Sequence, residues 1–237
     1  MIIDISHHQD PTKINYDILC KQVKLAIIRT QYGSTVIDKH FKIHHLEFQK
    51  RGIPTACYAW VRGINIKDMK TEATDFYNRT KEFEPTIWFL DVEEKSMSDI
   101  RAGVSAYIGQ LRALGVKKVG IYIGHHLYKD FNLNLDEADA VWIPHYGVNN
   151  VTINSKSSYP CDIHQFTSKG KLDGYSGDLD LNRLMDSKSL EFFTYTPSSL
   201  ANEAWEWGIK ENITDGKRPK DYATREEIVT MLYRSRK

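Results

Sequence analysis

The sequence lacks the features that mark several classes of protein. It has no run of eighteen apolar residues, so no membrane-spanning helix is predicted. Its 32 Lys and Arg residues nearly balance its 31 Asp and Glu residues, and the net charge of +1 argues against binding to nucleic acid. The three cysteines, Cys20, Cys57 and Cys161, are widely spaced and fit no CxxC pattern, so we expect free thiols.

Glycines and histidines also form no recognisable cofactor or metal motif. No glycine pattern for dinucleotides or phosphates occurs, and the histidine pairs at 7–8, 44–45 and 125–126 lack the Glu of an HExxH motif. We therefore expect no cofactor and no metal. The first six residues predict a strand, without the basic and apolar regions of a secretory signal. This pattern predicts synthesis in a cytoplasm without a signal peptide.

The sequence does contain short apolar runs that alternate with longer amphipathic stretches, which is typical of strands alternating with helices. Helical periodicity is clear over 39–51, 68–83 and 98–114, whereas 146–162 has the composition of a loop. The predicted fold is α/β, an irregular TIM-like β/α barrel with a small C-terminal helix-loop-helix domain, because eight strands suit a closed barrel. The predicted strands are 2–6, 25–30, 54–60, 86–92, 119–124, 140–145, 162–167 and 177–181.

The pattern changes after residue 190, where we place the end of a barrel domain that spans 1–190. A linker at 196–199 precedes a helix at 200–211, and Thr224 to Glu227 form a capping-box sequence that opens a last helix. A unit of this size, 197–237, holds a core of its own only marginally. Its apolar residues therefore need a cover, either the barrel, as a two-helix cap, or other copies of the chain. These residues are Trp205, Trp207, Ile209, Ile228, Met231 and Leu232.

Acidic residues cluster where the predicted strands end. Alternation along the strand 86–92 places Asp91 and Glu93 on one face and Glu94 on the other. Asp4 and Asp180 lie on the first and last strands, which are neighbours in a closed barrel. Any one of these residues is more often a simple strand terminator or helix cap. Together they indicate the paired carboxylates that cleavage of a glycosidic bond requires.

The motifs around these residues resemble those of the glycoside hydrolase family 25 lysozymes, in the same order and over about residues 1 to 190. They are Asp4-Ile-Ser-His-His8-Gln, Phe89-Leu-Asp91-Val-Glu93, His164-Gln-Phe-Thr and Gly174-Tyr-Ser-Gly-Asp-Leu-Asp180-Leu-Asn182. The resemblance implies a muramidase of the phage endolysin type. Such an enzyme hydrolyses the β-1,4 bond between N-acetylmuramic acid and N-acetylglucosamine of bacterial peptidoglycan, and it acts on the cell wall after release. The alternative is a non-catalytic protein that binds wall glycan.

The same resemblance implies roles for individual residues. Glu93 is expected to be the general acid, and Asp91 to orient the N-acetyl group of the substrate as an internal nucleophile. Asp4 and Asp180 are expected to line the pocket. His8 matches the family, and Tyr58, Trp142 and Tyr146 match aromatic positions of its glycan cleft. Trp60 and Tyr122 are further candidates because sugars stack on aromatic rings, although ordinary barrel core is an equally good interpretation of these two. The aromatic candidates are Tyr58, Trp60, Tyr122, Trp142 and Tyr146.

The sequence departs from the family at three positions, and its tail resembles a different family. Tyr32, Ala59 and Arg29 stand where the family usually has an acidic residue, a His and a Lys, which concerns substrate contacts. The tail resembles a single S-layer homology unit, which implies binding to a wall polymer and self-association into a homo-oligomer through residues 197–237.

Overall fold

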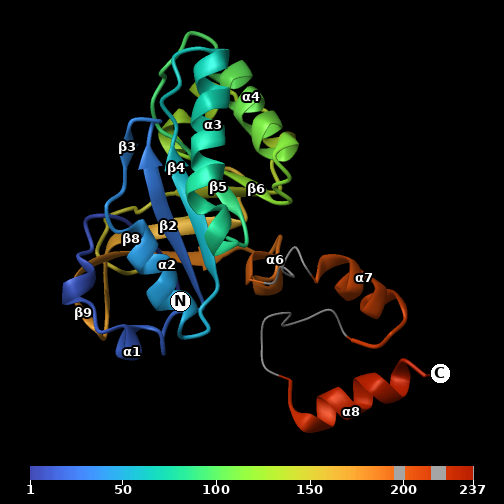
Figure 1. The fold of residues 1–237 in the computed structure, drawn as a ribbon. Helices are drawn as coiled ribbons and strands as arrows, with labels where there is room; N and C mark the ends of the chain where they lie inside the picture. The colour runs from blue at the N-terminus through green and yellow to red at the C-terminus, as the bar shows by residue number, and fades with distance from the viewer. Residues whose placement is uncertain (195–200, 215–222, 237) are drawn as a thin grey trace.

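The computed structural model describes residues 1–194, 201–214 and 223–236. Eight of its nine strands close into a barrel, since each pairs with the next and β1 pairs with both β2 and β9; β3 (Val36–Ile37) lies beside β2 (Figure 1). The barrel strands are β1 (Ile2–Ile5), β2 (Leu25–Tyr32), β4 (Thr55–Trp60), β5 (Trp88–Val92), β6 (Val119–Ile123), β7 (Ala140–Pro144), β8 (Ile163–Leu172) and β9 (Tyr175–Leu184). The eight predicted strands and the barrel fold are confirmed.

The last strand runs against its neighbours. The barrel strands from β1 to β8 pair in parallel, but β9 is antiparallel to both β8 and β1, and the short strand β3 outside the barrel is antiparallel to β2. The connection between β8 and β9 is a tight turn with Gly174 at φ +96°, and such a short connection only allows an antiparallel pair. Asp180 therefore comes level with Asp4 through the β1–β9 register, although β9 has the opposite direction to the other strands.

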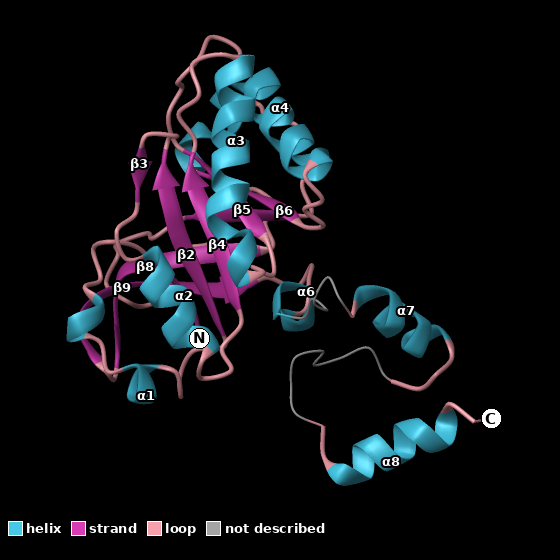
Figure 2. Cartoon of the chain, in the orientation of Figure 1, coloured by secondary structure: helices cyan, strands magenta, loops and turns pink. Residues whose placement is uncertain are grey.

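Helices cover the barrel unevenly (Figure 2). The long helices α2 (Phe41–Gln49), α3 (Ile66–Thr80) and α4 (Ile100–Ala113) lie in the first half of the chain, where they follow β3, β4 and β5. The remaining barrel helices are short, namely α1 (Tyr16–Leu19), α5 (Tyr128–Phe131) and 3-10 turns at Pro11–Lys13, Lys81–Phe83, His125–Leu127 and Leu135–Glu137. No helix lies between β7 and β8, so the predicted irregularity of the second half is confirmed.

Side-chain caps fix where the two longest helices begin. The Asn65 side chain accepts a hydrogen bond from the backbone N–H of Asp68 at the start of α3, and Asp99 accepts one from Ala102 at the start of α4. Such caps satisfy N–H groups that have no partner within the helix. The turns that lead into α3 and α4 follow β4 and β5, so the caps also hold the loops next to the ends of these strands.

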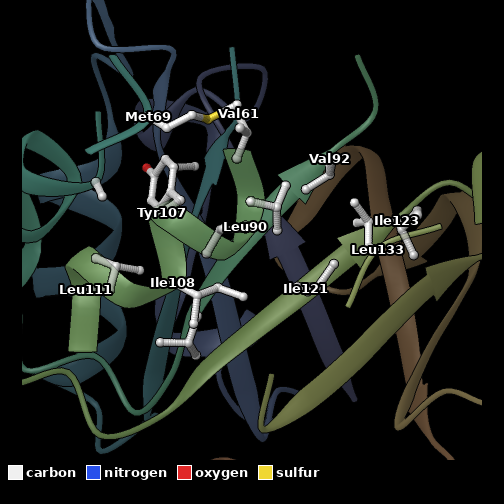
Figure 3. Close-up of a cluster of buried hydrophobic side chains, with 14 of the residues drawn as sticks. Val61, Met69, Leu90, Val92, Tyr107, Ile108, Leu111, Ile121, Ile123 and Leu133 are labelled. Atoms are coloured by element: carbon white, nitrogen blue, oxygen red, sulfur yellow. The ribbon is translucent and has the colours of Figure 1, made fainter. Parts of the chain in front are cut away.

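The apolar core has two layers that follow the alternation of the strands. Figure 3 shows the outer layer, in which Leu90, Val92 and Ile121 of the barrel wall pack with Tyr107 and Leu111 of α4. Each fully buried side chain of this kind contributes roughly 1.5–3 kcal/mol. The alternate residues point into the barrel, where they form the inner layer. This layer includes Ile2, Ile27, Tyr58, Phe89, Tyr122 and Trp142.

The inner layer is closed at one end by α6 (Leu190–Thr194). Phe193 of this helix is fully buried among the first residues of the strands, such as Leu25 and Ala56. The packing of the barrel thus reaches three residues beyond the predicted end of its domain at 190. The opposite end of the inner layer, at the last residues of the parallel strands, is where the acidic side chains lie.

Two helices follow in the tail, as the sequence predicts: α7 (Asn202–Lys210) and α8 (Arg225–Arg234), drawn beside the barrel in Figure 1. The capping box at the start of α8 is present, because Glu227 and Thr224 exchange hydrogen bonds of 2.8 and 3.2 Å with each other's backbone N–H groups. The predicted linker at 196–199 lies outside the described residues. No helix in the described parts of the chain is long and apolar enough to cross a membrane.

Candidate active site

The predicted acidic residues converge at the mouth of the barrel. Asp91, near the end of β5, is level with Trp60 on one neighbouring strand and Tyr122 on the other. Asp4 is paired with Asp180 across β1 and β9. The charges of Asp4, Asp91 and Asp180 all act on the buried hydroxyl of Tyr58 and raise its pKa, after the larger effect of burial. The structure thus brings the acids from three strands around one point.

Asp4 is held by a network of amide side chains. Its Oδ2 accepts hydrogen bonds from Gln165 Nε2 at 2.7 Å and from Asn182 Nδ2 at 2.8 Å. Burial raises the pKa of Asp4, and the negative charge of Asp180 raises it further, whereas these two hydrogen bonds lower it. Burial also raises the pKa of Asp180, to about 6. The two amides fix the orientation of the Asp4 carboxyl group without adding charge.

Asp91 has an oxygen that the protein leaves available. The residue is buried, and its Oδ1 has no hydrogen-bond partner among the described residues. Burial, Glu93 and Asp4 raise the pKa of Asp91, while the positive charge of Arg29 lowers it. A buried carboxylate oxygen without a donor is costly in a folded protein. An oxygen of this kind at the mouth of a barrel can accept a hydrogen bond from a group that enters the site.

Glu93 lies one residue beyond the end of β5 and keeps some exposure to solvent. Burial raises the pKa of Glu93, and His126 and a hydrogen bond with Tyr122 oppose this effect. Its neighbour Glu94 turns the other way, to the surface, where Arg62 Nε lies 3.0 Å from Glu94 Oε2. The two glutamates therefore have different environments, as alternation along the strand predicts.

The aromatic candidates fall into two groups. Tyr146 and Trp60 are partly exposed, and Tyr146 donates a hydrogen bond of 2.6 Å to Gln165, as Tyr122 does at 3.0 Å. Trp142 is only 1% exposed, and its ring contacts Tyr58, Phe89 and Tyr122, so no face of the ring is free for a sugar. The indole instead donates to Asn182 at 2.8 Å, which links it to Asp4.

His8 lies at the edge of this region. It is exposed on the loop after β1, and its ring centroid is 4.0 Å from that of His7. Trp60 is the last residue of β4, and its ring centroid is 5.1 Å from that of Tyr32. Among the described residues, no group of three or more His, Cys, Asp or Glu side chains could hold a metal ion.

Sequence reasoning gave no role to two residues that organise the site, Gln165 and Asn182. Both are buried and point inward, and they connect Asp4 with Tyr122, Tyr146 and Trp142. The alternation that placed Asp180 also places Asn182 two residues later on the same face. That signal was present in the sequence, but the antiparallel course of β9 hides which end of the strand reaches the mouth.

A mainly parallel barrel with carboxyl groups and partly exposed aromatic rings at its mouth has the features of a glycoside hydrolase, because acid chemistry and sugar contacts can both be provided there. The sequence matches the family description "Glycosyl hydrolases family 25" over residues 3–175. The chain belongs to this family. It is a peptidoglycan-hydrolysing lysozyme, that is, a muramidase.

Solved structures agree with this assignment. The virulence factor GHIP, a glycosyl hydrolase 25 of Streptococcus pneumoniae, is 36% identical, with 83% of this chain and 93% of that chain covered and a TM-score of 0.80. The catalytic domain of endolysin ply40 from bacteriophage P40 of Listeria monocytogenes is 28% identical, with coverages of 78% and 92% and a TM-score of 0.72. The CTP1L endolysin shares the fold at 18% identity, with coverages of 99% and 97% and a TM-score of 0.63. No curated protein matches the chain.

Proposed function

We propose that Glu93 is the general acid of this muramidase and that Asp91 positions the substrate's N-acetyl group for attack on the sugar carbon. The observation that carries the proposal is the unpartnered Oδ1 of Asp91, because an acetamido N–H is the donor that such an oxygen lacks. The bond cleaved is the β-1,4 linkage between N-acetylmuramic acid and N-acetylglucosamine.

The environment of Glu93 supports its role as the acid. Burial raises the pKa of its carboxyl group, which favours the protonated form that can donate to the leaving oxygen. Its partial exposure leaves the carboxyl group within reach of a bound glycan. We assign Asp4 and Asp180 to the lining of the same pocket, because Asp4 raises the pKa of Asp91 and Asp180 raises the pKa of Asp4. The second function, a protein that binds wall glycan without cutting it, would need no such acid.

Substitution of Glu93 by Gln tests the proposal. The change removes the proton but keeps the shape, so we expect a loss of roughly 10²–10⁴-fold in the rate of release of reducing ends, with folding unchanged. Asp91→Asn should be severely impaired as well. Glu94→Gln is the matched control, because its partner is the surface residue Arg62. Near-normal activity of Glu93→Gln, or a severe loss in Glu94→Gln alone, would contradict the assignment.

We also propose that the enzyme acts as an endolysin and that its tail, residues 197–237, binds a wall polymer and self-associates. The family match ends at residue 175, so the tail has to be assigned from its own residues. Apolar side chains of α7 and α8 remain in water within one chain, among them Trp207 at 53% and Leu232 at 58% exposed. Contiguous exposed apolar surface favours association. Several copies would also raise the avidity for the wall.

Light scattering on the full chain tests self-association. The variants Trp207→Glu and Leu232→Glu place charges on the exposed faces, and we expect them to reduce the apparent mass to that of a monomer. Val36→Glu, on the equally exposed short strand β3, is the control. Co-sedimentation with purified walls should weaken in the same two variants. A full chain that is already monomeric, or variants that sediment normally, would refute these roles of the tail.

A further inference from the structure

The mouth of the barrel holds four carboxyl groups and few positive charges. Asp4, Asp91, Glu93 and Asp180 are all largely buried, and burial is the main cause that raises the pKa of each. Within the described residues, the positive groups that act on this set are Arg29, on Asp91, and His126, on Glu93. One permanent positive charge therefore faces the site, and its placement needs an explanation.

Arg29 points into the barrel from β2. Leu25 and Ile27 of this strand belong to the inner layer, so alternation turns Arg29 inward as well. It is level with Tyr58 on the neighbouring strand. The charge of Arg29 lowers the pKa of the Tyr58 hydroxyl, whereas the charges of Asp4, Asp91 and Asp180 raise it. Its side chain is 14% exposed. The pairing of β2 with β4 shifts directly after Arg29, and a bulge of this kind changes the direction of a side chain beside a site.

A buried carboxylate outside the acid set holds this arginine. The side chain of Asp38, 1% exposed, lies after β3, and its Oδ2 accepts from Arg29 Nε at 3.2 Å. The same carboxylate accepts from the backbone N–H groups of His7 at 2.7 Å and His40 at 3.0 Å. Arg29 Nη2 contacts His7 Nδ1, which can accept because burial, and then the charge of Arg29, lower the pKa of His7. The loop after β1 and the segment after β3 thus fix one guanidinium group.

We propose that Asp38 is a positioning residue that holds Arg29 as the counter-charge of Asp91, so that Asp91 stays ionised beside a protonated Glu93. This inference rests on the proposed function, in which Asp91 orients the substrate as a carboxylate. The groups that face Asp91 are Glu93 at the end of its own strand, Asp4 of β1, Arg29 of β2, Tyr58 of β4 and Tyr122 of β6. Arg29 is the one among them that favours the ionised form of Asp91.

The pH dependence of kcat distinguishes a counter-charge from a structural tie. Removing a positive charge beside an acid raises the pKa of that acid, so Arg29→Gln should keep Asp91 protonated up to a higher pH. We expect the acidic limb of the kcat profile, measured on solubilised glycan strands, to move upward by about one pH unit or more. Asp38→Asn should move the same limb in the same direction by a smaller amount, since it only loosens Arg29. Arg29→Lys keeps the charge and should restore the limb.

Arg51→Gln is the matched control, because this arginine also has two carboxylate partners, Asp17 and Glu47, but lies away from the mouth. It should leave the limb in place. A fall in kcat or a rise in KM with an unmoved limb in Arg29→Gln would overturn the proposal and leave the role of Asp91 intact. A normal kcat in Asp91→Asn would overturn both, because no ionised Asp91 would then be needed. If Asp38→Asn fails to fold, the pH profiles of Arg29→Gln and Arg29→Lys still test whether Arg29 is the counter-charge of Asp91.

Discussion

Glu72 gives the stability of the barrel a dependence on pH that one substitution should remove. This residue of α3 is 1% exposed, and both of its carboxylate oxygens accept from the backbone N–H of Arg62, at 3.3 and 3.2 Å. Burial raises its pKa from 4.5 to about 8. The ionised form, which prevails in the unfolded chain at neutral pH, is thus poorly tolerated in the folded one.

The magnitude follows from the two pKa values. An acid whose pKa is raised on folding contributes stability below its unfolded pKa of 4.5, and this stability is lost as the pH rises to about 8. One pKa unit corresponds to about 1.4 kcal/mol, so the full loss above pH 8 is about 5 kcal/mol and the loss at pH 7 is about 3 kcal/mol. Glu72→Gln keeps an acceptor for the N–H of Arg62 but cannot ionise. Its free energy of unfolding should exceed that of the parent by less than about 1 kcal/mol near pH 5 and by about 3–5 kcal/mol at pH 8.

Urea unfolding of both proteins at intervals between pH 5 and pH 8 measures this difference. The gap in free energy should widen with pH, by at most about 1.4 kcal/mol per pH unit, because one proton is involved. Glu82→Gln, at a surface pair with Lys42, should show no such trend. A gap that stays constant with pH, or a glutamine variant that is less stable at pH 8, would refute the account of Glu72.

Four further substitutions test the packing of the barrel. Gly120→Ala would place a Cβ 2.2 Å from the ring of Phe89 inside the barrel and should cost about 1–3 kcal/mol in unfolding free energy, whereas Gly109→Ala, on the open face of α4, should gain about 0.5–1 kcal/mol. Phe193→Ala should cost about 3–5 kcal/mol in the same assay, because it empties the closed end of the barrel. Asn182→Ala should cost about 1–3 kcal/mol and lower kcat, because buried polar groups lose their partners.

Features that depend on periodicity could be predicted from the sequence. The strand positions and the common face of Asp91 and Glu93 follow from a period of two residues, which the barrel wall enforces by burying alternate side chains. The position of Glu94 at the surface follows from the same rule. These predictions needed no knowledge of distant contacts, because each strand carries the pattern by itself.

Features that depend on contacts between distant segments could not be predicted. Trp142 is an aromatic residue of the kind that stacks on sugars, but its side chain is buried inside the barrel, where its ring packs against that of Tyr122. Phe193 lies in a stretch without strand or long-helix periodicity, and only the closed barrel shows that its ring fills the end of the inner layer. Asp38 has no motif around it, and its partners Arg29 and His7 come from other segments. Packing and hydrogen bonds across the fold decide such cases.

The buried polar network explains how one barrel can hold several acids in different states. Asp180 raises the pKa of Asp4, and Glu93 and Asp4 raise the pKa of Asp91, so full ionisation of the set would be unfavourable in this buried region. Neutral donors compensate Asp4, because Gln165 and Asn182 supply hydrogen bonds without charge. The positive charge of Arg29 acts on Asp91 instead and lowers its pKa. Glu93 has a hydrogen bond with Tyr122 and a histidine nearby, and it keeps access to solvent. In the proposed mechanism, the differences among these partners, more than the number of acids, separate the proton donor Glu93 from the ionised carboxylate Asp91.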